Sequence, residues 1–491
     1  MLATALALST ALVTTDAAVL RAAPRESAQQ QAQLWQGELL EVRGERLDWL
    51  QVWDHRRERG GFVRASQVRR TALNAAEAPE LLAVLRFVRE SAGNEALGIA
   101  LAGAWLQAAP AEAVRGEAGV EALDAIGTLA DRLAQRASSA GAGQGSGVAS
   151  PVATPGKGAQ AAIAAHLDVA AQYGVKFTSY EREGRMQVCY DGDAFRRVLA
   201  LESQPAQRAR AALALTRTEC IDPNLQPLAR HKVNAWRAQV LDRVDVSTLP
   251  AYTKNRIAMR RASVWSTLAY EHARLGDAAS RTAAQRALDE LASVHKSELP
   301  EEDAPLYNEA AMRVNASRWA AVVDTPAQPA GNRPAILTVR AQPGVTCVLL
   351  VDAKADISRP LAKRCTFAQV WPQSASLNRE GNALALAVQP MESWRELWLF
   401  RKTERGWAID VLPPASVAPE LGYAEFAGWV PGGQQVLVAR EARGEGKYKR
   451  NYEVMNLDTL TVQRQTGDAS TLGPFQRWQD PAWKRTTVSL R

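Results

Sequence analysis

The spacing of apolar residues changes twice along the chain, and each change predicts a change of secondary structure. Residues 12–70 hold short runs in which apolar and polar positions partly alternate, and this period of two predicts strands separated by turns. From Pro79 to residue 137, and through most of 161–323, apolar residues recur every three or four positions, which predicts helices. After residue 334 the alternation returns. The pattern predicts a multidomain α+β protein.

One β-hairpin interrupts the otherwise all-α central region. The runs Val175–Tyr180 and Met186–Tyr190 have the composition of strands, and they flank Glu183–Gly184, which are typical turn residues. Asp193 is expected to be the N-cap of the helix that follows. Residues 265–278 are similar to part of a tetratricopeptide repeat, but no second copy follows, so a plain helical bundle is predicted.

Two stretches rich in Gly, Ala and Pro are expected to be flexible linkers between the structured segments. The predicted segments, in chain order, are a possible truncated signal peptide at 1–11, a small β-barrel at 12–70, a helical segment at 79–137, a linker at 138–160, a helical domain with the hairpin at 161–323, a linker at 324–334 and a β-rich domain at 335–491.

The motifs of the first β segment follow one another in a known order. Ala17–Pro24 is followed by Leu34–Val42, then by Trp49–Val52 and Gly61–Val63. In this order they resemble the bacterial SH3-like domain family, with Phe62 in place of the usual Trp and with an altered opening turn. The resemblance implies a small barrel that binds cell-wall glycopeptide or a protein partner through an aromatic groove between loops.

Four aromatic residues of this segment, Trp35, Trp49, Trp53 and Phe62, are the candidate groove residues. Aromatic side chains offer large apolar area, and Trp adds a polar N–H, so they suit a binding groove. The same properties suit the core of a small barrel. For each of the four, groove and core both remain open.

The last segment contains two stretches that are similar to each other, Ser374–Ala387 and Phe426–Ala439. Both resemble the strand–turn–strand repeat of blades in propellers of the TolB type, with Gly432–Gly433 where that family has Asp-Gly. About three blades fit in the segment, fewer than the four that a closed propeller needs. An antiparallel β domain with blade-like repeats is therefore expected, either incomplete and packed or completed by a partner.

Tryptophan is enriched in this last segment, where it is interpreted as blade core or as an aromatic binding surface. Half of the chain's fourteen Trp lie there: Trp371, Trp394, Trp398, Trp407, Trp429, Trp478 and Trp483.

The four cysteines form two pairs that are local in sequence, which predicts the disulfides Cys189–Cys220 and Cys347–Cys365. Such pairs favour an oxidising compartment. The alternative is four buried thiols in a cytosolic protein.

The first eleven residues support export, because they are an Ala/Leu-rich run with Ser9 and Ala11 at the spacing of a signal-peptidase site. The run lacks a basic n-region, so a truncated signal peptide is favoured over an ordinary N-terminal segment. Neither this run nor residues 97–106 is long enough to span a membrane.

The formal net charge of +7 comes mostly from Arg spread along the chain, without a basic stripe or a reader motif. A nucleic-acid partner is therefore not expected. No cofactor motif is found, and the spacing of the five His to the Cys predicts no metal site. The acids Glu183, Asp191 and Asp193 are the candidate group for a hydrolase, although caps and turns explain them more simply.

Together these features predict an exported, periplasmic and non-catalytic protein of the bacterial envelope. Its SH3-like module is expected to bind cell-wall glycopeptide or an envelope protein, and its C-terminal β domain to serve as an interaction or scaffold domain. Two alternatives remain open: an envelope hydrolase that the module brings to its substrate, and a cytosolic interaction protein with reduced cysteines.

Overall fold

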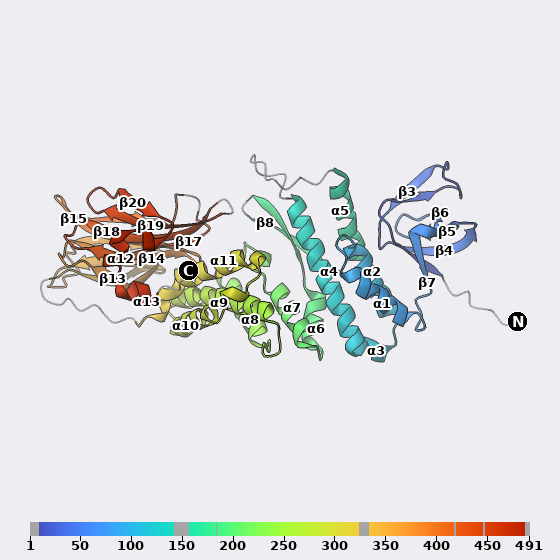
Figure 1. Cartoon of the computed structure of the whole chain (residues 1–491), viewed down its shortest axis with the longest axis horizontal. Helices are drawn as coiled ribbons and strands as arrows, with labels where there is room; N and C mark the ends of the chain where they lie inside the picture. The colour runs from blue at the N-terminus through green and yellow to red at the C-terminus, as the bar shows by residue number, and fades with distance from the viewer. Residues whose placement is uncertain are drawn as a thin grey trace. The chain divides into compact units, whose positions relative to one another are not determined.

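The computed structural model describes residues 9–141, 157–182, 184–323, 333–416, 419–444 and 447–486. Residues 1–8 of the predicted leader and most of both predicted linkers lie outside these ranges. Within them the chain is a mixed α+β protein with several mainly antiparallel sheets, which confirms the predicted class (Figure 1). No helix in the described ranges combines the length and the apolar composition needed to cross a membrane.

The chain divides into two compact units. The first comprises residues 1–226 with 244–248, and the second comprises 227–243 with 249–491.

The first unit begins with a seven-stranded sheet, in which every pairing is antiparallel. Its strands lie in the order β3-β2-β6-β5-β4-β1-β7 and curl around one core of aliphatic side chains, to which all seven contribute. The strands are β1 (Thr10–Val13), β2 (Ala18–Arg21), β3 (Gln30–Leu34), β4 (Leu39–Arg46), β5 (Trp49–Asp54), β6 (Arg59–Arg64) and β7 (Val68–Thr71).

This sheet is not closed into a barrel, and the predicted barrel is wrong in that respect. The edge strands β3 and β7 do not pair with each other in the described residues. Side chains reach the edge of β3 instead: Arg57 Nη2 donates to the Gln33 carbonyl (3.2 Å), and Arg59 Nη1 donates to the Gln31 carbonyl (2.8 Å). These bonds occupy acceptors that a closing strand would need, and they protect the edge.

Helices pack against the sheet to complete the first unit. They share one apolar core, which includes Leu12 of β1. Helix α2 is buried on nearly all sides, and a side chain at its Gly103 would come within 2.5 Å of the Tyr173 ring, so only glycine permits this approach. The helices are α1 (Ala78–Arg89), α2 (Glu95–Ala108), α3 (Ala111–Arg115), α4 (Glu117–Gly141), α5 (Lys157–Gln172), α6 (Asp193–Ala200) and α7 (Pro205–Leu215).

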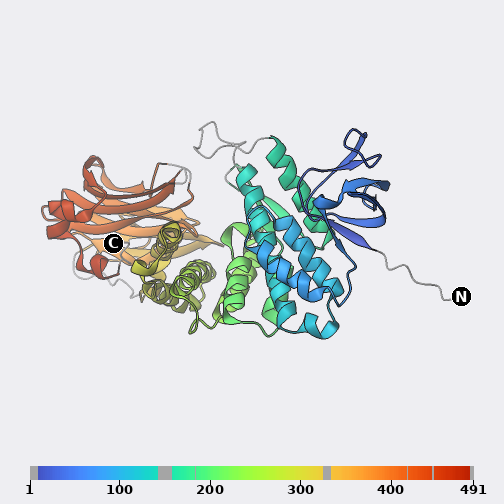
Figure 2. The ribbon, with the colours of Figure 1, turned by 45° about the vertical axis from the view of Figure 1, so that its right-hand side comes forward.

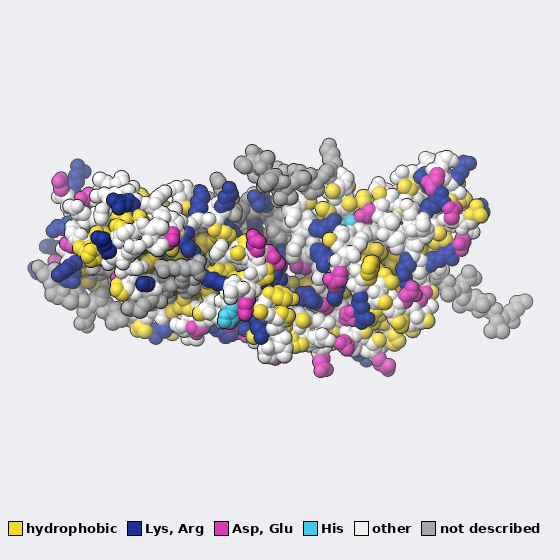
Figure 3. All heavy atoms as spheres, in the orientation of Figure 1, with side chains coloured by type: hydrophobic (Ala, Val, Ile, Leu, Met, Phe, Trp, Pro, Cys, Tyr) yellow, Lys and Arg dark blue, Asp and Glu magenta, His cyan; other side chains and the backbone are white. Residues whose placement is uncertain are grey.

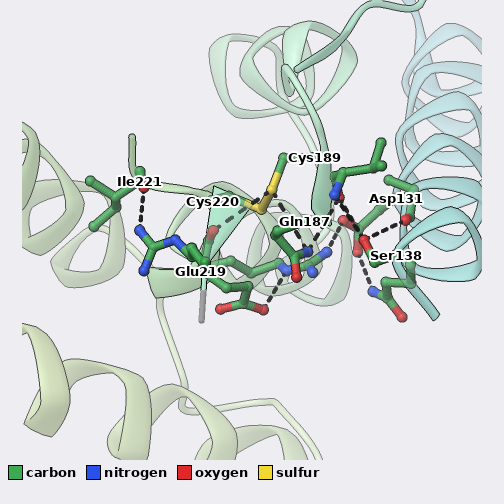
Figure 4. Close-up of a disulfide and its surroundings, with 12 residues drawn as sticks. Asp131, Ser138, Gln187, Cys189, Glu219, Cys220 and Ile221 are labelled. Atoms are coloured by element: carbon green, nitrogen blue, oxygen red, sulfur yellow. Dashed lines mark hydrogen bonds and ion pairs between the residues drawn. A yellow bond between two sulfur atoms is a disulfide. The ribbon is translucent and has the colours of Figure 1, made fainter. Parts of the chain in front are cut away.

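The predicted hairpin is confirmed as β8 (Phe177–Arg182) and β9 (Arg185–Tyr190), and a disulfide fastens it. Cys189 of β9 is bonded to Cys220 of the short 3-10 helix η3 (Thr218–Cys220), as predicted (Figure 4). Beside the bond, Arg217 pairs with Asp131 of α4 and donates to Glu219 (2.8 Å). The disulfide and the ion pair together fix the hairpin and η3 to α4.

The second unit combines a helical part with a three-stranded sheet and an eight-stranded sheet. Helix α9 packs against the other three helices. The helices are α8 (Pro227–Asp242), α9 (Ala251–Leu275), α10 (Ala279–Ala292) and α11 (Ala304–Ser317).

The predicted β-rich segment forms one three-stranded sheet and two four-stranded meanders, drawn in orange to red in Figure 2. In the described residues the meanders join through two parallel residue pairs between β15 and β17, which is a departure from the predicted antiparallel domain. The three-stranded sheet holds β10 (Ala335–Gln342), β11 (Val345–Val351) and β12 (Ala362–Thr366). The first meander holds β13 (Gln369–Leu377), β14 (Ala383–Met391), β15 (Trp394–Thr403) and β16 (Gly406–Leu412). The second holds β17 (Leu421–Val430), β18 (Gln435–Gly444), β19 (Lys447–Asn456) and β20 (Val462–Thr466).

The three-stranded sheet and the two meanders stack face to face, because their central strands are largely apolar on both sides. Leu384 and Leu386 of β14 pack against the three-stranded sheet, whereas Ala385 on the opposite side packs against the second meander. The outer side of the second meander is covered by α12 (Gly473–Trp478) and α13 (Pro481–Thr486). The second predicted disulfide, Cys347–Cys365, joins β11 to β12.

A buried ionic triad joins the helical part of the second unit to its sheets. Glu425 of β17 accepts hydrogen bonds from Arg318 (Nε at 3.1 Å, Nη2 at 2.6 Å) and from Arg395 of β15. The three side chains are at most 2% exposed. Burial alone would raise the pKa of Glu425, but the two guanidinium groups outweigh it and hold the pKa below its ordinary value. Glu425 is therefore charged in the folded chain.

Replacing both cysteines of the first disulfide tests its role as a fastener. The double variant Cys189→Ser/Cys220→Ser is expected to lower the free energy of unfolding of the first unit by about 3–4 kcal/mol, because the unfolded chain regains the entropy of an open loop. Urea denaturation of the full chain measures it. Cys347→Ser/Cys365→Ser is the matched control and should affect the second unit instead. Equal effects of both variants on the first unit would contradict the assignment.

Replacing the buried acid tests the triad. Glu425→Gln leaves two buried guanidinium groups without a counter-charge, so the free energy of unfolding should fall by about 3–5 kcal/mol. Since the pKa of Glu425 is lower in the folded chain, its contribution is present above the unfolded pKa of about 4.3 and is lost as the pH falls below it. The control Glu404→Gln, in an exposed turn, should change stability by less than about 0.5 kcal/mol. Similar losses in both variants would count against the triad.

Candidate functional site

Three of the four predicted groove aromatics lie on the outer face of the N-terminal sheet. Trp49 and Trp53 alternate along β5 with the core residue Leu50, and Phe62 of β6 is next to the core residue Val63. Because successive side chains of a strand point to opposite faces, all three aromatic side chains point away from the core. The apolar core of the described sheet is aliphatic and contains none of the four candidates.

Two glycines of the neighbouring strands lie opposite β5. Gly60 is the cross-strand partner of Trp53, and a Cβ at Gly60 would lie 3.3 Å from Cε3 of that ring. Gly44 is the partner of Gln51, which is exposed between the two tryptophans of β5. The Trp53 indole therefore lies close to the backbone of β6.

Two arginines stack on the tryptophans of this face. The guanidinium carbon of Arg43 lies 4.4 Å from the centroid of the Trp53 ring, and that of Arg64 lies 4.4 Å from the Trp49 ring. Both distances are within the range of cation–π attraction. Trp49 is only 3% exposed beneath Arg64, whereas Trp53 and Phe62 are half-buried. A ligand on this face would thus touch Trp53 and Phe62 directly.

Carboxylates hold both arginines in place. Glu41 accepts hydrogen bonds from Arg43 (3.0 Å) and from His55 (2.6 Å), and these two bonds hold the pKa of Glu41 below its ordinary value. At the other end, Glu26 accepts from Arg64 (2.8 Å), which likewise lowers the pKa of Glu26. Trp49, Trp53 and Phe62, which together form the aromatic strip, therefore lie between two ionic clusters. Each cluster contains a charged acid and a cation.

Trp35 is not part of this strip. It lies in the turn between β3 and β4, where its ring meets the buried His166 of α5 edge to face, with centroids 6.2 Å apart. His166 Nε2 lies 2.8 Å from Asp16 Oδ1, and Gln36 Nε2 donates to the Gly93 carbonyl (2.7 Å). Trp35 therefore belongs to the junction at which the sheet meets the helices of the first unit.

The two ring nitrogens of His166 have different surroundings. His166 Nδ1 is buried without a hydrogen-bond partner, whereas Nε2 bonds to Asp16 Oδ1. Burial alone would raise the pKa of Asp16, but its hydrogen bond and electrostatic interaction with His166 outweigh burial, so the pKa lies below its ordinary value. No local signal in the sequence pairs these two residues, which are 150 positions apart.

The candidate acids near the hairpin have structural contacts. Asp191 Oδ1 accepts from the Asp193 N–H (3.0 Å), and Asp193 pairs with Arg197 one turn later (2.9 Å). Glu183 lies outside the described residues. The prediction that Asp193 is an N-cap is wrong by one residue: α6 begins at Asp193, because Gly192 takes the cap position with a φ of 84°.

The described part of the second unit contains a pocket of about 490 Å³ between β19, the loop after β20 and α12. Its polar side chains are bonded within the protein: Asp468 accepts from the Ser470 amide (2.9 Å), and Arg450 pairs with Glu441. Nowhere in the described ranges do three or more His, Cys, Asp or Glu side chains come together in a way that could hold a metal ion.

Comparison of the chain with models of known protein families, with curated proteins and with solved structures finds no match. The resemblances to the SH3-like and TolB-type families thus rest on the chain's own motifs. Sequence reasoning missed the residues that surround the aromatics, above all Arg43, Arg64 and Glu41. The place of Arg64 next to the β5 tryptophans could have been inferred from strand pairing, because Arg64 is the cross-strand partner of Trp49.

Replacing Asp16 tests how much the junction contributes to the stability of the first unit. Asp16→Asn weakens the bond to buried His166, so the free energy of unfolding of the first unit should fall by about 1–2 kcal/mol at neutral pH. Because the pKa of Asp16 is lowered by folding, the difference from wild type should shrink as the pH falls below about 4. Urea denaturation followed by tryptophan fluorescence measures both effects.

The matched control is Asp168→Asn. Asp168 is 65% exposed and pairs with Arg56 at 3.0 Å in the same unit, so its loss should cost at most about 1 kcal/mol. A cost for Asp16→Asn no larger than that of the control would contradict the proposed role of the junction.

Proposed function

We propose that this chain is an exported, non-catalytic protein of the bacterial envelope, located in the periplasm. Its N-terminal SH3-like module binds cell-wall glycopeptide or an envelope protein partner on the outer face formed by Trp53 and Phe62. The observation that carries the proposal is the position of the aromatics outside a core that is complete without them.

The chemistry of the face suits a glycopeptide. A ligand that covers a half-buried ring removes apolar area from water, which is favourable. Aromatic residues are also enriched among the anchors of binding surfaces. The Phe62 ring, and the part of the Trp53 ring that Arg43 leaves uncovered, offer apolar area to the C–H faces of sugars. Arg43 and Arg64, at opposite ends of the strip, offer guanidinium groups to peptide carboxylates. Exposed Gln51 adds amide hydrogen bonds between them.

The cysteines support the compartment. Both predicted disulfides are formed, and the described residues contain no free cysteine. Disulfides form and persist in oxidising compartments such as the periplasm and are rare in the bacterial cytosol. The predicted cleavage after Ala11 is wrong in position, because Thr10 and Ala11 belong to β1 and Ala11 is fully buried in the core of the sheet.

The C-terminal β domain acts as an interaction or scaffold domain in this proposal. Its two meanders each have four antiparallel strands, as propeller blades do, and the two similar stretches form the β13–β14 and β17–β18 hairpins. The outer side of the last meander is covered by α12 and α13 instead of a further blade. These features support the resemblance to TolB-type blades in a domain of fewer than four.

Removing the most accessible indole tests the binding face. The full chain is incubated with purified peptidoglycan sacculi, and the retained fraction is measured after centrifugation. Trp53→Ala is expected to lower the affinity about 30-fold, because loss of a central aromatic anchor costs about 2 kcal/mol. The control Phe87→Ala removes a 77% exposed ring from α1 of the same unit and should leave retention unchanged.

The results distinguish binding to the cell wall from binding to a protein partner. If wild type is not retained by sacculi, wall binding is excluded and the protein partner remains. If Trp53→Ala is retained as well as wild type, the outer face is not the binding site.

A further inference from the structure

Two histidines of the second unit lie in contact where α8 meets α9. The ring centroids of His231 and His272 are 5.0 Å apart, and the ring planes are nearly perpendicular at 85°. Figure 3 shows histidine side chains (cyan) at the surface of this helical region, beside acidic ones (magenta). The side chains of His231 and His272 are 24% and 18% exposed, so solvent reaches both.

A carboxylate orients each ring. His231 Nδ1 lies 2.9 Å from Glu271 Oε2, and His272 Nδ1 lies 2.9 Å from Asp277 Oδ2. The second oxygen of Glu271 accepts a hydrogen bond from Asn234 (2.7 Å), which fixes the carboxylate. A neutral imidazole beside a carboxylate keeps its proton on the nitrogen that faces the acid, so Nε2 of each ring carries a lone pair.

This arrangement is typical of histidines that bind metals, which donate their other N–H to a carboxylate. The distance between the rings also fits. Two imidazoles bound to one tetrahedral zinc ion, with Zn–N bonds of roughly 2.0–2.1 Å, place their ring centroids about 5 Å apart. The observed separation is 5.0 Å. Within the described residues neither Nε2 has a hydrogen-bond partner.

We propose that His231 and His272 form a two-imidazole site for a borderline transition-metal ion, Zn²⁺ or Cu²⁺, bound through both Nε2 atoms. Glu271 and Asp277 supply the charge that offsets the divalent ion. No third protein ligand of the His, Cys, Asp or Glu types converges on the site in the described ranges, so water completes the coordination. The site is therefore open and exchangeable, unlike a closed structural zinc site. All four cysteines are in disulfides and do not compete.

Metal titration of the full chain tests the site. After treatment with a chelator and its removal, the protein is titrated with ZnCl₂ by calorimetry, and one equivalent should bind. His231→Gln and His272→Gln should each lower the affinity at least tenfold, since each removes one of two ligands. Glu271→Gln should lower it about tenfold or more through the lost orientation of His231. His55→Gln, an exposed histidine in the first unit, is the matched control and should bind as wild type does.

A second readout does not depend on the variants. With Cu²⁺, which N-ligand sites bind more tightly than Zn²⁺, the electron paramagnetic resonance spectrum of wild type should show coupling to two imidazole nitrogens. No zinc binding by wild type, coupling to fewer than two nitrogens, or an equal loss in His55→Gln would overturn the proposal. Circular dichroism in the presence of chelator confirms that each variant is folded before its zinc affinity is measured.

Discussion

Buried carboxylates need a counter-charge, and this constraint organises the described part of the chain. Each Asp and Glu that is buried there forms an ion pair with at least one Arg. A buried acid without such a partner would cost several kcal/mol. The pairs are Glu38–Arg57, Asp54–Arg57, Glu95–Arg136, Asp124–Arg210, Asp303–Arg256, Glu425–Arg318, Glu441–Arg450 and Glu453–Arg440.

These ion pairs show where part of the chain's Arg content lies in the structure. The chain has 59 Lys and Arg against 52 Asp and Glu, and the excess is spread along the sequence. Several Arg side chains pair with buried carboxylates, and others make contacts at the surface of the N-terminal sheet. Arg57 and Arg59 donate hydrogen bonds to backbone carbonyls of β3. Arg43 and Arg64 stack on the indole rings of β5. Part of the Arg content thus has a structural role in the described residues.

The proposed binding face and the proposed metal site depend on the same kind of support. At the face, Glu41 and Glu26 hold the arginines that cover the tryptophans. At the histidine pair, Glu271 and Asp277 hold the rings. In both places a carboxylate orients a group whose other side is open to solvent, which is how a site is preorganised for a ligand.

The sequence alone determined the features that depend on neighbouring residues. Local periodicity predicted the strands of 12–70, the helices and the hairpin at Glu183–Gly184, and cysteine spacing predicted both disulfides, which the structure confirms. Only the tertiary structure decided which partners meet from far along the chain. It left the N-terminal sheet open, placed Trp35 against His166 and apart from Trp53, and brought His231 to His272. The physical reason is that a period of two or 3.6 fixes which side of an element is buried, whereas the partner on that side is chosen by packing of the whole unit.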